Sequence, residues 1–150
     1  MRQSYRPSIQ PKPPPYRTQL FDHLGLVAGM CEELGSAEVM DQATQQNPDM
    51  RLVTAGQAVK AMVLNGLGVV NQQLYLVPHF LQNKPTSRLI APAIHASHLN
   101  DDTLGRPLDT LYASGVTELS SLLAATAAKR LGLAPTCTHL DSPSFHVDGR

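Results

Sequence analysis

Residues 54–67 have the sequence Thr-Ala-Gly-Gln-Ala-Val-Lys-Ala-Met-Val-Leu-Asn-Gly-Leu, the clearest helix-forming stretch of this chain. Thr54 and Gln57 have the spacing of a capping box, in which each side chain bonds to the backbone N–H of the other residue. Apolar positions then recur at helical spacing, and the expected buried stripe comprises Val59, Met62, Val63, Gly66, Leu67 and Val70. The stretch therefore predicts an amphipathic helix within a helical domain.

Further helices are expected upstream of this stretch. Apolar spacing predicts one from Phe21 that ends at Gly35, with Asp22 near its start as a cap. A second, short helix is expected over residues 37–43, after Ser36, and it should end before Pro48 because proline disfavours helix in the residue before it. Two helices therefore precede the capping box.

Downstream, short helices are expected over residues 74–81 and 86–90. Asn100 then begins a longer helix whose expected stripe is Leu104, Leu108, Leu111 and Tyr112, and a last helix runs from Val116 to a stop at Gly132. No strand pattern occurs before residue 136. The fold class is therefore mainly α, with an all-helical domain over residues 20–135.

The two ends of the chain differ from this domain in composition and in the spacing of apolar residues. Residues 1–19 hold five prolines and several basic residues, which predicts a disordered, proline-rich basic arm. After Pro135 the apolar spacing changes from helical to alternating, which predicts a β-hairpin over residues 136–150. A domain boundary is therefore expected at Pro135.

Charge is balanced overall but uneven along the chain. Twelve Lys and Arg offset twelve Asp and Glu, so no whole-molecule field favours nucleic acid or a membrane. Residues 51–100, however, hold basic residues and no acidic ones. The candidate DNA-phosphate contacts in this zone are Arg51, Lys60, Lys84 and Arg88. Any affinity for duplex DNA is then expected to fall with salt.

Cysteine usage and hydropathy indicate a cytoplasmic protein. Cys31 and Cys137 are isolated from each other, which suits a reducing compartment. No apolar run reaches the ~20 residues of a spanning helix, and the N-terminal prolines do not fit a signal peptide. We expect neither a membrane nor a small-molecule substrate as partner.

The candidate metal-binding residues lie in the predicted hairpin. Asp141 would stand at the tip of the first strand, where a carboxylate can ligate a divalent cation. Two alternatives stay open: a zinc cluster, or solvent-facing turn residues at Asp141 and Asp148. The zinc cluster would comprise Cys137, His139 and His146 with either aspartate.

Several segments together resemble a known family. Residues 21–35, 58–68 and 139–149, with shorter matches at 74–78, 82–86 and 125–133, resemble the N-terminal part of bacterial insertion-sequence transposases. These are DDE enzymes of the sixteen-thirty-four type within the IS-four superfamily. The resemblance runs from about Leu20 to Arg150.

The resemblance implies a helical N-terminal domain that leads into an RNase H-like catalytic domain. Asp141 matches the first acid of the D-D-E triad, and so becomes the expected catalytic residue and metal ligand, for Mg²⁺ or Mn²⁺. The family cuts and joins DNA, so the implied partners are the ends of the element and further transposase subunits. Pro143, after Asp141-Ser142, departs from the usual motif and removes a strand N–H, and Pro107 departs within a predicted helix.

Two functions follow as expectations. The first is a truncated transposase, inactive by itself because one aspartate cannot build a two-metal site, and at most able to bind DNA or a partner. The second is a stand-alone helical interaction module that binds or inhibits the intact transposase. A third possibility is a decayed gene product that is poorly folded after residue 135.

Overall fold

The computed structural model describes residues 18–44, 52–68 and 73–134, and every regular element in these ranges is a helix. The elements are α1 (Leu24–Leu34), α2 (Ser36–Thr44), α3 (Ala55–Gly66), η2 (Leu74–Leu76), α4 (Val77–Leu81), α5 (Thr86–Leu89), η3 (Ala96–His98), α6 (Asp101–Ala113) and α7 (Val116–Arg130). The prediction of a mainly α domain is confirmed. Residues 1–17 of the predicted basic arm and all of the predicted hairpin lie outside the described ranges.

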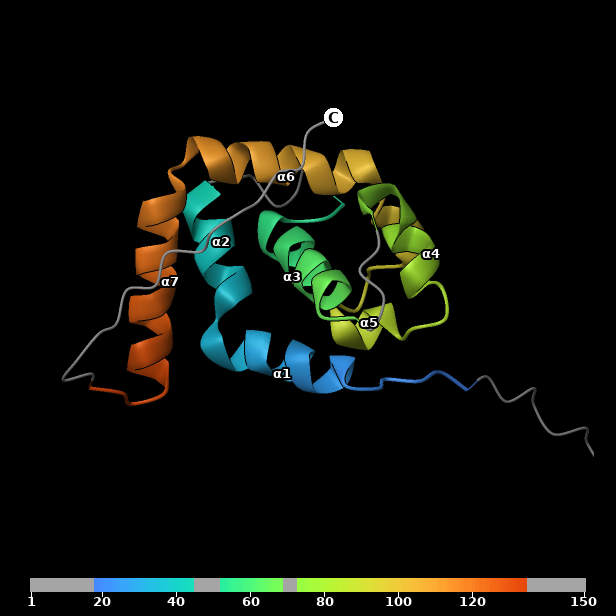
Figure 1. Ribbon diagram of the computed structural model, residues 1–150, viewed down its shortest axis with the longest axis horizontal. Coiled ribbons are helices and arrows are strands. Elements are labelled where there is room, and N and C mark those ends of the chain that lie inside the picture. The colour runs from blue at the N-terminus through green and yellow to red at the C-terminus, as the bar shows by residue number, and fades with distance from the viewer. Residues whose placement is uncertain (1–17, 45–51, 69–72, 135–150) are drawn as a thin grey trace, which may run out of the picture.

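The helices surround α3 (Figure 1). In that view α6 lies along the top, α7 along the left side and α1 along the bottom, with α4 and α5 on the right. Helix α3 contacts α1, α2, α4 and α6, whereas α7 contacts α1, α2 and α6. Helix α7 therefore lies on the outside, over the α1–α2 pair and the end of α6.

Two predicted side-chain caps are confirmed and a third is not. Thr54 Oγ1 accepts from the N–H of Gln57 at 3.2 Å and Gln57 Oε1 accepts from the N–H of Thr54 at 3.1 Å, so the capping box is confirmed. Asn100 caps α6 by accepting from the N–H of Thr103 at 2.9 Å. The predicted cap at Asp22 is wrong: the N-cap of α1 is His23, without a side-chain cap bond. Asp22 instead forms an ion pair with Lys84.

The predicted glycine stops are confirmed. Gly35 ends α1 with φ 70°, and Gly132 follows α7 with φ 64°. The N–H groups of Gly132 and Leu133 donate to the carbonyls of Lys129 and Ala128 at 3.3 and 2.8 Å, the bond pattern of a Schellman motif. Glycine tolerates the left-handed backbone that this motif requires.

The predicted buried stripe of α3 is wrong at its described positions, and its last residue, Val70, lies outside the described residues. The buried residues of α3 are Ala55, Gly56, Ala58, Lys60, Ala61, Leu64 and Asn65. Leu67 is 56% exposed instead, and Val59, Met62 and Val63 are only half-buried. Helix α3 lies at the centre of the domain, with helices packed against several of its sides. Small side chains such as alanine and glycine are buried there because they let these helices approach closely. At Gly56, an added Cβ would lie only 2.2 Å from the carbonyl oxygen of Ala37 on α2.

Helix α6 also buries a different face from the predicted one. Leu104 and Leu111 are buried as expected, and Pro107 is buried with them inside a helix that continues past it. Leu108 and Tyr112, expected in the core, are exposed instead. Leu108 and Tyr112 therefore leave apolar surface in contact with water.

Two apolar clusters hold the domain together. The larger includes Leu24, Leu64, Val77, Leu89 and Leu104, from α1 and from α3 to α6. The smaller comprises Met40, Leu111 and Leu119, from α2, α6 and α7, with Val59 and Leu123 partly buried against it. Leu119 is the one buried residue in the described length of α7. The smaller cluster therefore lies beneath the outer surface that α6 and α7 form together.

Candidate functional site

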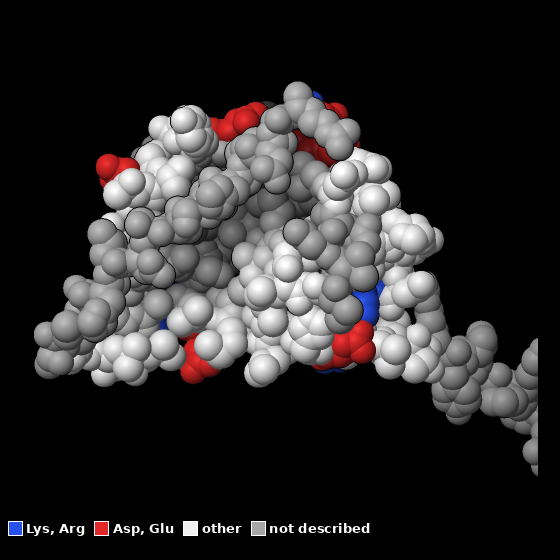
Figure 2. All heavy atoms as spheres, in the orientation of Figure 1, with Lys and Arg blue, Asp and Glu red and all other residues white. Residues whose placement is uncertain are grey.

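The four predicted DNA contacts do not form one basic surface. Arg51 lies outside the described residues, and Arg88 on α5 is exposed. Lys84 is mostly buried and forms an ion pair with Asp22. Lys60 on α3 is 3% exposed, so its charge lies inside the domain. In the view of Figure 2, the visible basic atoms appear as a few separate spots among acidic and uncharged atoms.

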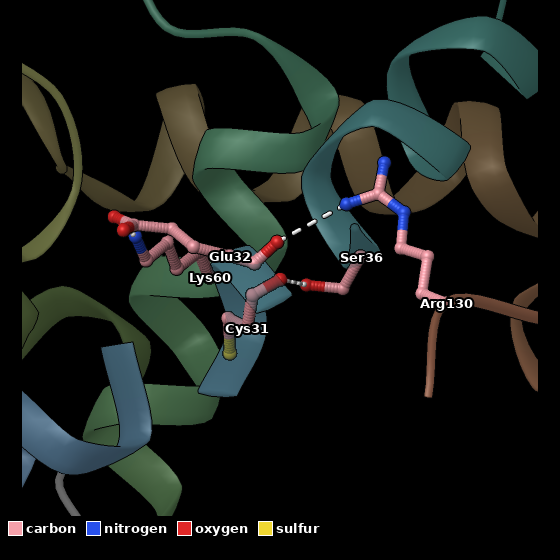
Figure 3. A network of polar contacts seen from close by, with 5 residues as sticks. All are labelled: Cys31, Glu32, Ser36, Lys60 and Arg130. Atoms are coloured by element: carbon pink, nitrogen blue, oxygen red, sulfur yellow. Dashed lines mark hydrogen bonds and ion pairs between the residues drawn. The ribbon is translucent and has the colours of Figure 1, made fainter. Parts of the chain in front are cut away.

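Lys60 is one half of an ion pair between α3 and α1. Its ammonium donates to Glu32 Oε1 at 2.7 Å, whereas 66% of the Glu32 side chain is exposed (Figure 3). The pair thus joins a buried cation to a carboxylate at the surface. A buried charge needs such a partner, so the structure gives Lys60 a role in joining two helices.

Arg130, from the last turn of α7, contacts the junction of α1 and α2 (Figure 3). Its guanidinium donates to the backbone carbonyl of Glu32 at 3.2 Å and lies 3.8 Å from the carboxylate of Glu38. It also fills the space where a side chain on Gly35 would lie. A cation at the C-terminal end of a helix is electrostatically favourable. This contact helps hold α7 in place.

The Lys60–Glu32 pair predicts two unequal effects on stability. Glu32→Ala should lower the free energy of unfolding by about 1–3 kcal/mol, because it leaves a buried ammonium without its acceptor. Lys60→Met should cost less than about 1 kcal/mol, because it fills the same space without a charge. Thermal unfolding followed by helical circular dichroism measures both. A larger loss for Lys60→Met than for Glu32→Ala would contradict this assignment.

An open apolar groove lies between α2, α6 and α7. Its volume is about 550 Å³, within the range of protein binding sites. The lining residues are Met40, Val59, Leu108, Asp109, Leu111, Tyr112, Val116, Leu119, Ser120 and Leu123. The smaller apolar cluster forms its floor. Helices distant in the sequence thus combine into one apolar surface.

Several residues around the groove are exposed although they are apolar. Tyr112 is 79% exposed, Val116 58% and Leu108 40%, while Asp109 is the single charged residue of the lining. Contiguous exposed apolar surface of this kind marks sites that contact a protein, a membrane or a ligand. Sequence reasoning assigned Leu108 and Tyr112 to the buried stripe of one helix and named Val116 only as the start of the next. The groove was therefore missed as a site.

A second, smaller cavity of about 220 Å³ lies beside the Lys60–Glu32 pair. Its lining includes three acids, Glu32, Glu38 and Asp41, each of which has a partner in the domain. The two oxygens of Asp41 accept from the N–H of Gly56 at 2.7 Å and from Thr54 Oγ1 at 3.0 Å. Asp41 thus fixes the start of α3 against α2, a role that sequence reasoning missed.

The predicted metal chemistry lies outside the described part of the chain. Asp141 and the zinc alternative of Cys137, His139 and His146 all fall in residues 135–150, so these predictions stay predictions. Among the residues with a described structure, no group of three or more His, Cys, Asp or Glu side chains converges on one point. No helix in the same ranges has the length and apolarity to cross a membrane.

Comparisons with known proteins bear on the helical domain. Neither the curated proteins nor the solved structures gave a significant match. A family model described as a domain of unknown function (DUF4277) matches residues 16–125, which include α1 to α6 and the first turns of α7. The chain therefore belongs to the DUF4277 family.

Proposed function

We propose that this chain is part of an insertion-sequence transposase and that its helical domain binds protein through the groove between α2, α6 and α7. The single observation that carries the docking role is the open apolar groove with its exposed rim. The transposase context is supported by the sequence resemblance. Within it, residues 136–150 begin an RNase H-like domain, and Asp141 is its first ligand for Mg²⁺ or Mn²⁺.

Docking of protein is favoured over docking of DNA because of the chemistry of the available surface. A DNA interface needs several cations that can reach phosphates together. Of the four predicted contacts, Lys60 is buried in its pair with Glu32 and Lys84 is paired with Asp22. The groove, in contrast, offers apolar surface with one charge. DNA contact by the helical domain is therefore proposed as weak and salt-sensitive.

Cleavage of DNA is not expected from these 150 residues by themselves. A two-metal mechanism needs carboxylates from separate elements, and Asp141 supplies one. The chain would then act by binding a longer transposase, either in assembly or in interference with it. We place this action in the cytoplasm, where the buried free thiol of Cys31 suits a reducing environment.

The test is direct binding of the purified chain to an immobilised longer transposase that carries the same helical domain and a full set of catalytic acids. Val116→Asp places a charge in the groove at the first position of α7, where the helix dipole tolerates an acid. We expect it to weaken binding about tenfold or more, equivalent to ~1.4 kcal/mol.

Leu26→Asp is the matched control, because Leu26 is 74% exposed in the first turn of α1, outside the groove lining. The affinity of this variant for the longer transposase should stay within about twofold of that of the unmodified chain. Equal binding by the unmodified chain and by Val116→Asp would rule out the groove as the docking site. Tight, salt-resistant binding to duplex DNA in a parallel titration would contradict the whole proposal.

A further inference from the structure

Helix α7 is much less buried than the helix at the centre of the domain. Leu119 is the one buried residue among the 15 of α7, whereas seven of the 12 residues of α3 are buried. The half-buried residues of α7 are Leu123, Thr126, Ala127 and Ala128, and the others are exposed. Segments with few buried apolar contacts open at a lower free-energy cost than the core. Helix α7 is therefore the long helix of this domain that should open most easily.

A single glycine joins α6 to α7. Gly115 lies between Ser114, the C-cap of α6, and Val116, the first residue of α7. Its φ of 89° and ψ of 105° lie in a region that residues with a side chain rarely adopt. No side-chain hydrogen bond caps the start of α7. Because a few residues at the end of an element can absorb a large change in φ and ψ, Gly115 can act as a hinge.

Arg130 holds the other end of α7 against the junction of α1 and α2 (Figure 3). Gly35 leaves room for this contact, since an added Cβ there would lie 2.2 Å from the Cζ of Arg130. The ion pair of Arg130 with Glu38 is long, at 3.8 Å, and the two side chains are 40% and 57% exposed. Exposed ion pairs stabilise a fold only weakly. This contact, the Arg130 latch, can therefore break while the core stays packed.

We propose that α7 opens as a unit, by rotation about Gly115 and release of the Arg130 latch, while α1 to α6 stay folded. The larger apolar cluster contains no residue of α7, so its packing does not depend on the position of that helix. The smaller cluster loses Leu119 on opening and retains Met40 and Leu111. A single helix of this length is marginal in water, so α7 loses its helical hydrogen bonds while it is open.

Opening of α7 removes one wall of the groove between α2, α6 and α7. The residues of that wall are Val116, Leu119, Ser120 and Leu123. Arg130 lies outside the groove lining, yet its latch determines how long the wall stays in place. A partner that binds the complete groove must favour the closed form, because a ligand shifts an equilibrium toward the state that it binds better. This consequence rests on the proposed function, whereas the opening of α7 does not.

The test of opening is hydrogen exchange of the 150-residue chain, followed by mass spectrometry of fragments that cover α7 and α3. The amides of α7 should exchange about tenfold faster than those of α3, or more, since they need only a local opening. Dilute urea should accelerate α3 more steeply than α7, because the effect of urea grows with the surface exposed on opening. Equal protection and equal urea dependence of the two helices would overturn the inference.

Arg130→Ala tests the latch, and Lys129→Ala is its matched control. Both residues are exposed cations in the last turn of α7, but none of the ion pairs among the described residues includes Lys129. Both variants remove one charge near the end of the helix dipole and add an alanine. Arg130→Ala should accelerate exchange of α7 about two- to fivefold, and Lys129→Ala less than about twofold. Equal effects of the two variants would overturn the inference.

The same measurement with the longer transposase separates this inference from the proposed function. At about ten times its dissociation constant, a transposase bound in the groove should slow exchange of α7 about tenfold. If α7 opens but the transposase neither binds nor slows its exchange, the inference is supported and the proposed function is overturned. If the transposase binds and Val116→Asp weakens it, while α7 and α3 exchange together, the inference is overturned and docking in the groove stands.

Discussion

Leu64→Ala is expected to lower the free energy of unfolding by about 2–5 kcal/mol, the range for removing a buried leucine side chain. Leu64 is fully buried on α3, the helix that contacts α1, α2, α4 and α6. Helices on several sides cannot all move inward, so the site should retain a cavity. For a domain whose total stability is of order 5–15 kcal/mol, this is a large share.

Leu67→Ala is the matched control for this substitution. Leu67 lies three residues further along, at the end of α3, and is 56% exposed. Its truncation should change stability by no more than about 0.5 kcal/mol. Urea unfolding of both variants, followed by the helical signal, gives the comparison. Similar losses for the two variants would mean that α3 is not the centre of the domain.

Gly56→Ala is expected to destabilise the domain by about 1–3 kcal/mol, although alanine is the better helix former. An added Cβ would lie 2.2 Å from the carbonyl oxygen of Ala37 and 2.6 Å from its Cα. These are backbone atoms of α2, so relief requires that α2 and α3 separate. Separation would also stretch the bond from the N–H of Gly56 to Asp41 Oδ1.

Gly66→Ala provides the opposite case in the same helix. An added Cβ at Gly66 meets nothing within 4 Å, so only the gain in helix propensity remains. This variant should be neutral or more stable by up to about 1 kcal/mol. Thermal unfolding of the pair separates packing from propensity. If Gly56→Ala were as stable as Gly66→Ala, the close approach of α2 and α3 would be wrong.

The sequence predicted where the helices lie because their ends are local events. The capping box at Thr54, the cap at Asn100 and the stops at Gly35 and Gly132 each depend on bonds within a few residues. The predicted cap at Asp22 is wrong because the N-cap of α1 is the next residue, His23, and the Asp22 carboxylate is paired with the distant Lys84 instead. Local signals thus fix boundaries unless a tertiary contact competes for the capping group.

Which face of a helix is buried depends on its neighbours, and there the sequence was a weaker guide. The stripe of α3 was wrong because a helix enclosed on several sides buries alanine and glycine at the closest contacts. Apolar spacing reports which face is hydrophobic, and not whether another helix covers it. Tyr112 and Leu108 belong to such a face on α6 that the described structure leaves exposed.

The candidate site was predicted least well, for two physical reasons. The sequence shows the sign of each charge but not how exposed the side chain is. Lys60 was therefore grouped with the surface cations, although it is 3% exposed and paired with Glu32. The groove needs α2, α6 and α7 together, and no single segment contains it. The predictions for Asp141 lie outside the described residues and stay as predictions.

The most direct test of the central claim is the transposition frequency of a longer transposase with this helical domain, measured in cells that also make the 150-residue chain. If the groove binds transposase, the unmodified chain and Leu26→Asp should lower the frequency about tenfold or more once the chain is made at about ten times its dissociation constant for the transposase. Val116→Asp, made at the same level, should leave the frequency near that of cells without the chain. Equal inhibition by Val116→Asp, or no inhibition by any chain, would contradict the account.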